Sequence, residues 1–177
     1  MDWLRASPSE LRIVSHPDPV LRQRAAVIDL TDSEATSQLR KIADRMVALM
    51  HEASGVGLAA PQVGLPIRMF VANWTQDPGD DHVFVNPELF DPAPNTESAE
   101  EGCLSLPEIR VEVTRPTAVG IRAIDLNGDA FEQVSDGFAA RVWQHEFDHL
   151  EGRLITDRMS LMDRVANRRA LKALGFA

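Results

Sequence analysis

The stretch of residues 144–149 constrains this chain most, because it places His145 and His149 four residues apart with Glu146 beside the first. On an α-helix, side chains four residues apart lie one turn apart on the same face, so the two imidazoles can bind one metal ion. Glu146 can then reach water at that metal. Two imidazoles do not complete a zinc site, which takes at least three protein ligands. The fold must therefore bring a third ligand to this helix.

One source of the third ligand lies downstream, as in zinc peptidases that share this pattern. One group of them uses a histidine six residues after the second, and this chain has Ile155 there. Another group uses a later glutamate, and no glutamate follows Glu151. Asp157 and Asp163 remain as downstream candidates, so a zinc metallopeptidase stays an alternative.

The other source lies upstream, at the single cysteine of the sequence, Cys103. A thiolate is a strong ligand for zinc and for ferrous iron. A lone cysteine can also be a small buried apolar residue. Its surroundings, residues 101–105 with the order Glu-Gly-Cys-Leu-Ser, favour the ligand interpretation.

Three motifs occur in a fixed order: Gly-Val-Gly-Leu-Ala-Ala-Pro-Gln at 55–62, Glu-Gly-Cys-Leu-Ser at 101–105 and Gln-His-Glu-Phe-Asp-His-Leu at 144–150. They resemble the three motifs of the peptide deformylase family, and residues 16–22 are similar to its amino-terminal segment. The resemblance covers residues 12–160. It implies a hydrolase that removes formate from the amino-terminal formylmethionine of newly made polypeptides. It also implies one divalent metal ion held by Cys103, His145 and His149.

The resemblance further implies roles in catalysis. Glu146 takes a proton from the attacking water and returns it to the leaving amine. The side-chain amide of Gln62 and the backbone N–H of Leu104 donate hydrogen bonds to the oxyanion. Among the metals, the resemblance favours Fe(II), while thiolate and imidazole ligands also suit zinc, nickel and cobalt.

Five residues are candidates for substrate binding. Gly57 has no side chain, which fits close approach to a peptide backbone, although a loop after a helix would also use glycine. Val56, Phe138 and Val142 are the expected apolar slot for methionine. Arg110 falls where the family holds the peptide backbone beyond the methionine.

Other residues fit supporting roles. We expect Glu101 to form an ion pair with Arg115, which the family places opposite it. Asp148 is a candidate to brace His145, and exposure on the helix surface is its alternative. Arg141 departs from the aliphatic residue of the best-known bacterial members and resembles the organellar-type branch. It leaves the shape of the methionine pocket open.

A third interpretation is a non-catalytic deformylase-like metal-binding protein. A structural metal site normally needs four protein ligands. The remaining histidines lie outside the three motifs, at His16, His51 and His82.

Length and composition limit the classes of protein. At 177 residues, we expect one catalytic domain over residues 1–177. One cysteine excludes an intramolecular disulfide and suits a reducing compartment. No apolar run approaches the roughly 18 residues of a membrane span, and Met1–Arg5 lacks the apolar core of a signal peptide. We therefore expect a cytoplasmic protein without a membrane partner.

Charge is unevenly distributed. The net charge is −9, which argues against general nucleic-acid affinity. Residues 153–177 nevertheless carry six basic against two acidic residues, a net of +4, so the remainder carries −13. A contact between this basic carboxy-terminal helix and ribosomal RNA is one interpretation. The other is an ordinary amphipathic helix in which Leu161, Val165 and Leu171 pack and the arginines are solvated.

Periodicity predicts an α+β domain of short antiparallel strands around a central metal-bearing helix, with an amino-proximal and a carboxy-terminal helix. Apolar residues at helical spacing predict a helix over 35–53, capped by Asp32 or Ser33. Residues 67–72, 82–85, 109–113 and 117–125 read as extended, and 91–95 as a loop. Asn127 and Gly128 suit a tight hairpin into 131–134. The metal-bearing helix should run from Gly137 to near Gly152.

Overall fold

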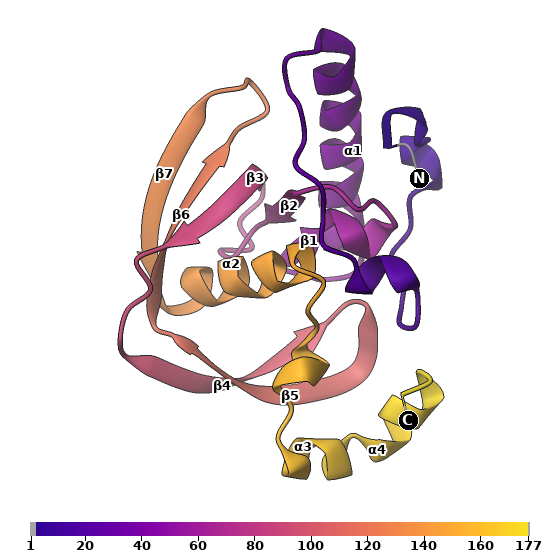
Figure 1. Cartoon of the computed structure of the whole chain (residues 1–177), viewed down its shortest axis with the longest axis vertical. Helices are drawn as coiled ribbons and strands as arrows, with labels where there is room; N and C mark the ends of the chain where they lie inside the picture. The colour runs from indigo at the N-terminus through magenta and orange to yellow at the C-terminus, as the bar shows by residue number, and fades with distance from the viewer. Residues whose placement is uncertain (1–2, 177) are drawn as a thin grey trace.

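The computed structural model describes residues 3–176 (Figure 1). Met1, Asp2 and Ala177 lie outside the described residues, so the ends of the predicted domain and of the basic segment are not covered. The fold contains two antiparallel sheets, with helix α2 (Gly137–Leu150) between them (Figure 1). The predicted α+β class and its central metal-bearing helix are therefore confirmed.

The larger sheet has five strands in the order β1-β2-β3-β6-β7. Their bounds are β1 Gly57–Ala59, β2 Met69–Ala72, β3 His82–Phe90, β6 Ala118–Ile124 and β7 Ala130–Asp136. The predicted hairpin at Asn127 and Gly128 joins β6 to β7, with Ile124 opposite Ala130. The predicted strand at 67–72 begins two residues later than expected, and β3 extends five residues beyond the predicted 82–85.

The smaller sheet pairs β4 (Thr96–Cys103) with β5 (Leu106–Pro116), and the predicted loop at 91–95 leads into it. Sequence analysis missed β4, because its polar, glutamate-rich composition has low strand propensity. It also missed β1, three residues within the glycine-containing first motif. Strands β1 and β4 both contain residues of the candidate site, Gly57 and Cys103. The two strands that were not predicted are therefore ones that position the site.

Helix α1 (Ser33–Glu52) matches the predicted amino-proximal helix. The Asp32 carboxylate accepts a hydrogen bond from the backbone N–H of Glu34, which satisfies one of the free donors of the first turn. The apolar stripe of α1 packs against β1 and β2 and is fully buried. This stripe forms a core whose buried residues include no ligand or catalytic candidate, although the Leu104 side chain packs against it.

The carboxy-terminal helix is present as two short helices, α3 (Leu161–Ala166) and α4 (Arg168–Ala173), separated at Asn167. They lie along β5 (Figure 1). Leu171 packs into a core with β5, as expected. The packing expected for Leu161 and Val165 is wrong, since they are 82% and 76% exposed.

Shorter 3₁₀ helices occur in the connections, at Trp3–Arg5, Pro8–Glu10, Pro19–Arg22, Ala60–Val63 and Ile155–Arg158. Within residues 3–176, no helix combines the length and the apolar character that crossing a bilayer requires.

Candidate metal centre

Three side chains converge between α2 and the end of β4. His145 and His149 lie one turn apart on α2, and Cys103 is the last residue of β4. The Cys103 sulfur and one nitrogen of each histidine all lie within 4.8 Å of one another. Cys103 Sγ is 3.3 Å from Nε2 of His149. One thiolate and two imidazoles form a suitable donor set for a divalent transition metal, so these residues fit such an ion.

The remaining ring nitrogen of His145 is oriented by a carboxylate. Nδ1 lies 3.0 Å from Oε2 of Glu101, which leaves Nε2 for the metal. Glu101 lies two residues before Cys103 on β4, and strand residues two apart point to the same side. The strand therefore supplies both the thiolate and the group that orients a histidine ligand, the arrangement that commonly fixes a metal-binding imidazole.

The protonation states of the two histidines differ. Burial lowers the pKa of His149 well below its ordinary value, so its imidazole is neutral, as a metal ligand must be. Burial also opposes the charge on His145, but its hydrogen bonds with Cys103 and Glu101 outweigh this and raise its pKa to about 10. A metal ligand must be a neutral imidazole, so metal binding competes with the proton on His145.

Glu101 and Arg115 form the predicted ion pair, and both are buried. Arg115 Nε donates to Oε1 at 2.6 Å and Nη2 to Oε2 at 2.9 Å. Burial disfavours the charge on Glu101, but the hydrogen bonds from Arg115 and His145 hold the pKa of this carboxyl well below its usual range. The carboxylate is therefore ionised wherever the protein is folded near neutral pH.

The prediction that Asp148 braces His145 is wrong. Asp148 Oδ2 accepts from Arg115 at 2.9 Å, and Arg158 donates to both of its oxygens, at 3.0 and 2.7 Å. Glu101 instead occupies Nδ1 of His145. Asp148 thus anchors the carboxy-terminal side of α2 to β5 and to the 3₁₀ helix that ends at Arg158.

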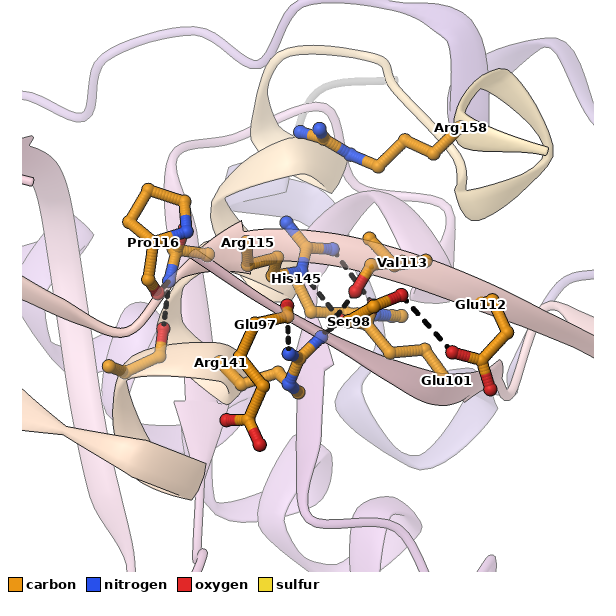
Figure 2. Close-up of polar contacts among 12 residues, drawn as sticks. Glu97, Ser98, Glu101, Glu112, Val113, Arg115, Pro116, Arg141, His145 and Arg158 are labelled. Carbon is orange, nitrogen blue, oxygen red and sulfur yellow. Dashed lines mark hydrogen bonds and ion pairs between the residues drawn. The ribbon is translucent and has the colours of Figure 1, made fainter. Parts of the chain in front are cut away.

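The Arg141 side chain is held by hydrogen bonds to residues of β4 and β5. Figure 2 shows its side chain reaching from α2 to the β4–β5 pair. Its Nη1 donates to Glu101 Oε1 at 2.8 Å and to the carbonyl of Val113 at 2.9 Å, and Nη2 to the carbonyl of Glu97 at 2.9 Å. The guanidinium is thus committed to this network, and the rest of the side chain lines the cavity.

Glu146 is buried beside the metal donors, and a Cβ at Gly57 would collide with its carboxylate. Glycine at position 57 therefore makes room for this side chain. Burial raises the pKa of Glu146 to about 7. Its Oε2 is buried and has no hydrogen-bond partner among residues 3–176. An unpaired buried oxygen is costly, so a water or substrate proton is its expected partner.

Gln62 lies beside the Cys103 sulfur. Its Oε1 accepts from the backbone N–H of Ala59 at 2.9 Å, which fixes the amide orientation. Nε2 lies 3.6 Å from Cys103 Sγ and 3.3 Å from Ser105 Oγ. The contact with Ser105 is long for an N–H···O bond, so this N–H can turn to another acceptor in the cavity. Leu104 directly follows Cys103 in the turn between β4 and β5.

All candidate substrate residues line one cavity of 580 Å³, which Gln62, Leu104, His145, Glu146 and Cys103 also line. They are Val56, Gly57, Arg110, Phe138 and Val142. The structure thus brings together every catalytic and substrate-binding candidate; of the metal ligands, Cys103 and His145 line the cavity, and His149 contacts the Cys103 sulfur without lining it.

The alternative ligands lie elsewhere. Asp157 pairs with Arg22, and the Asp163 carboxylate accepts hydrogen bonds from Ser160, the residue that caps α3. His51 and His82 pair with Asp81 and Asp80, and His16 stacks on Phe176. Over residues 3–176, Cys103, His145 and His149 are the only Cys, His, Asp or Glu group placed to hold a metal. This disfavours both a downstream-ligand peptidase and a four-ligand structural site.

Sequence reasoning missed two contributors, Ser105 beside Gln62 and Arg158 beside Asp148. Ser105 belongs to the second motif, so its proximity to the sulfur could have been inferred. Glu101 as the partner of His145 could have been found from strand alternation, had β4 been recognised. Nothing in the sequence indicates the contact of Arg158.

Comparison with known proteins gives consistent results. The polypeptide deformylase family model matches residues 10–165. A peptide deformylase of Rhodopirellula baltica is 48% identical over 151 residues, covering 84% of this chain and 73% of that protein. One of Thermotoga petrophila is 47% identical and covers 90% of this chain and 93% of its own length. The crystal structure of plant peptide deformylase PDF1B is 40% identical, with a TM-score of 0.86 over 94% of this chain and 89% of that one.

Proposed function

The chain belongs to the peptide deformylase family and removes the formyl group from the amino terminus of polypeptides, and we propose how its residues divide this reaction. The observation that carries the proposal is the position of Glu146. Its unpartnered carboxylate oxygen is buried in the cavity that Cys103 and His145 also line. Such a group is suited to move a proton rather than to hold the fold together.

In this proposal Cys103, His145 and His149 hold one divalent ion. When bound, the ion lowers the pKa of water towards about 7 and polarises the formyl carbonyl. Glu146, with a pKa of about 7, accepts a proton from the water that attacks the formyl carbon. As the carbon–nitrogen bond breaks, Glu146 returns the proton to the leaving amine. A pKa near the working pH suits both transfers.

Gln62 and Leu104 stabilise the negative charge that develops on the formyl oxygen. The Gln62 amide is held by Ala59, and one of its N–H groups makes only a long contact, with Ser105. It is therefore oriented in advance and free to donate when the charge forms. The backbone N–H of Leu104 supplies the second donor in this proposal.

The methionine side chain occupies the slot of Val56, Phe138 and Val142, with Gly57 against the peptide backbone. Arg110 holds the backbone beyond the methionine. Arg141 supports the slot without offering its charge to the substrate, because its guanidinium is bound to Glu101 and to two backbone carbonyls.

A formate-release assay tests this function. Protein loaded with Fe(II), Zn, Ni or Co should release formate from formyl-Met-Ala-Ser and leave acetyl-Met-Ala-Ser intact. Fe(II) is the ion we propose for the cell, so it should give the highest turnover. Cys103→Ala should lose both stoichiometric metal and turnover. Release of methionine or Ala-Ser without formate would instead favour a peptidase, and metal binding without turnover a non-catalytic protein.

We also propose that the basic carboxy-terminal segment contacts ribosomal RNA, in a reducing cytoplasm that keeps the Cys103 thiolate available. Arg158 is committed to Asp148 and does not contribute. Arg164, Arg168 and Arg169 are exposed, and none forms an ion pair with another described residue. They offer a local positive surface on an otherwise acidic protein, which brings the enzyme to its emerging substrate.

Co-sedimentation with ribosomes tests this contact. Replacing Arg164, Arg168 and Arg169 together with glutamine should reduce pelleting at low salt, and binding by the parent should fall steeply as salt rises. Replacing Arg12, Arg24 and Arg122 with glutamine makes the same charge change elsewhere and should have little effect. Equal pelleting of the parent and both variants would contradict the proposal.

A further inference from the structure

Arg110 reaches the cavity because of its partner on the neighbouring strand. It lies opposite Gly102 in the β4–β5 pair. A Cβ at Gly102 would collide with the Arg110 guanidinium, so the absence of a side chain lets Arg110 lie across β4. The guanidinium itself is weakly held, at 3.2 Å from the carbonyl of Ile109 and 4.0 Å from Glu100, and the side chain is 59% exposed. Its position therefore depends on its backbone.

That backbone is held from the other edge of β5 by Asn167. The N–H of Arg110 donates to Oδ1 of Asn167 at 3.2 Å, and Nδ2 of Asn167 donates to the carbonyl of Arg110 at 2.7 Å. Because both backbone groups point away from β4, Arg110 and Gly102 form the non-hydrogen-bonded kind of cross-strand pair, in which side chains are closest. The same Nδ2 also donates to the carbonyl of Asp163 at 2.9 Å.

We propose that Asn167 is a positioning residue that orients Arg110 for binding the substrate chain beyond the methionine. Asn167 lies between α3 and α4. Its hydrogen bonds to Arg110 therefore link the carboxy-terminal segment to a residue that lines the cavity. The inference rests on the proposed role of Arg110. A side chain needs both an acceptor and a donor to hold the N–H and C=O of one residue, and asparagine has both.

The linkage makes a specific kinetic prediction. Without Asn167, the backbone of Arg110 is free to move, and fixing it on binding costs affinity. The loss of these hydrogen bonds should raise KM for formyl-Met-Ala-Ser by about threefold to tenfold. The value of kcat should stay within about twofold, because Asn167 contacts none of the reacting groups. Formyl-Met amide, which ends at the methionine, should keep its KM.

The experiment compares Asn167→Ala, Arg110→Ala and the double variant on both substrates, at one metal load. Met162→Ala is the control, since Met162 lies on α3 and is 84% exposed. The two single variants should show the same KM effect on the longer substrate, and the double variant no more than Arg110→Ala alone. Asn167→Asp keeps the acceptor but loses the donor, so its KM should fall between those of the parent and Asn167→Ala. It replaces the alanine variant in the test if that variant does not fold.

The outcomes separate the two proposals. If Arg110→Ala leaves KM for the longer substrate unchanged, the proposed role of Arg110 fails, and this inference with it. If Arg110→Ala raises KM but Asn167→Ala and Asn167→Asp do not, the positioning role alone is wrong. An equal rise for both substrates, or additive losses in the double variant, would also overturn it.

Discussion

Helices α1 and α2 are both amphipathic, but they bury different chemistry. The buried face of α1 is apolar, with Leu39, Ile42, Met46 and Met50 fully enclosed. Helix α2 also buries polar and charged residues: Gln144, Glu146, Asp148 and His149. Burying polar groups costs free energy unless they are paired, so the buried polar residues of α2 depend on partners from other elements, whereas the apolar face of α1 does not. Helix α1 thus stabilises the fold, whereas α2 positions the groups proposed to react.

The polar face of α2 is tolerated because residues from other elements satisfy most of it. Arg115 contacts Glu101 and Asp148, and Arg158 contacts Asp148 (Figure 2 shows both arginines). Three buried atoms of α2 have no partner in the described chain: Oε2 of Glu146, Nδ1 of His149 and Nε1 of Trp143. The unpartnered carboxylate oxygen among them is the group proposed to move the proton.

The largest effect on stability should come from breaking the buried network. Arg115→Met leaves two buried carboxylates short of a partner and should lower the free energy of unfolding by about 3–5 kcal/mol. Arg122→Met is the matched control, because its pair with Glu132 is exposed at 3.1 Å; it should cost at most about 1 kcal/mol. Denaturant unfolding of both variants, with and without zinc, measures this. Equal small losses would contradict a buried network that supports α2.

A somewhat smaller effect, on turnover, should follow Gln62→Leu. Removing one oxyanion donor typically costs about 2.7–4 kcal/mol of transition-state stabilisation, roughly a 10²–10³-fold loss in kcat. KM should change little, because the donor matters most when charge develops on oxygen. Steady-state kinetics on formyl-Met-Ala-Ser checks this. Unchanged kcat at saturating substrate would remove Gln62 from that role.

The smallest effect should come from the apolar helix. Ile42→Val in α1 removes one buried methyl group and should cost about 0.5–1.5 kcal/mol of stability. Turnover and KM should match the parent, since α1 contributes no proposed catalytic group. Thermal unfolding and kinetics on one preparation measure both. A clear fall in kcat for the folded variant would show that the packing of α1 also affects the reaction.

Different features of the sequence predicted helix α1 and the metal ligands on α2. Helical periodicity identified α1, since apolar packing has a spacing that can be read directly. The spacing of His145 and His149 identified the metal-binding face of α2, and resemblance to a family supplied Cys103. Both kinds of signal are local in the sequence.

What could not be predicted depends on distant contacts. Asp148 lies one helical turn from His145, which suggested a bracing role, but arginines from β5 and from the 3₁₀ helix at 155–158 bind it instead. Strand β4 was missed because cross-strand pairing, rather than propensity, stabilises it. The division of the carboxy-terminal helix at Asn167 was likewise not predicted, and the Asn167 amide bonds a residue 57 positions away.

In the proposed mechanism α2 separates metal binding from proton transfer: its histidines, with Cys103, hold the ion, and Glu146 moves the proton. Metal content and formate release, measured on the same sample of Glu146→Gln, test it most directly. Glu34→Gln, on the exposed surface of α1, is the control. The account predicts one metal ion per chain in both variants, with a loss of about 10²–10⁴-fold in turnover for Glu146→Gln alone. Turnover within threefold of the parent at full metal content would contradict it.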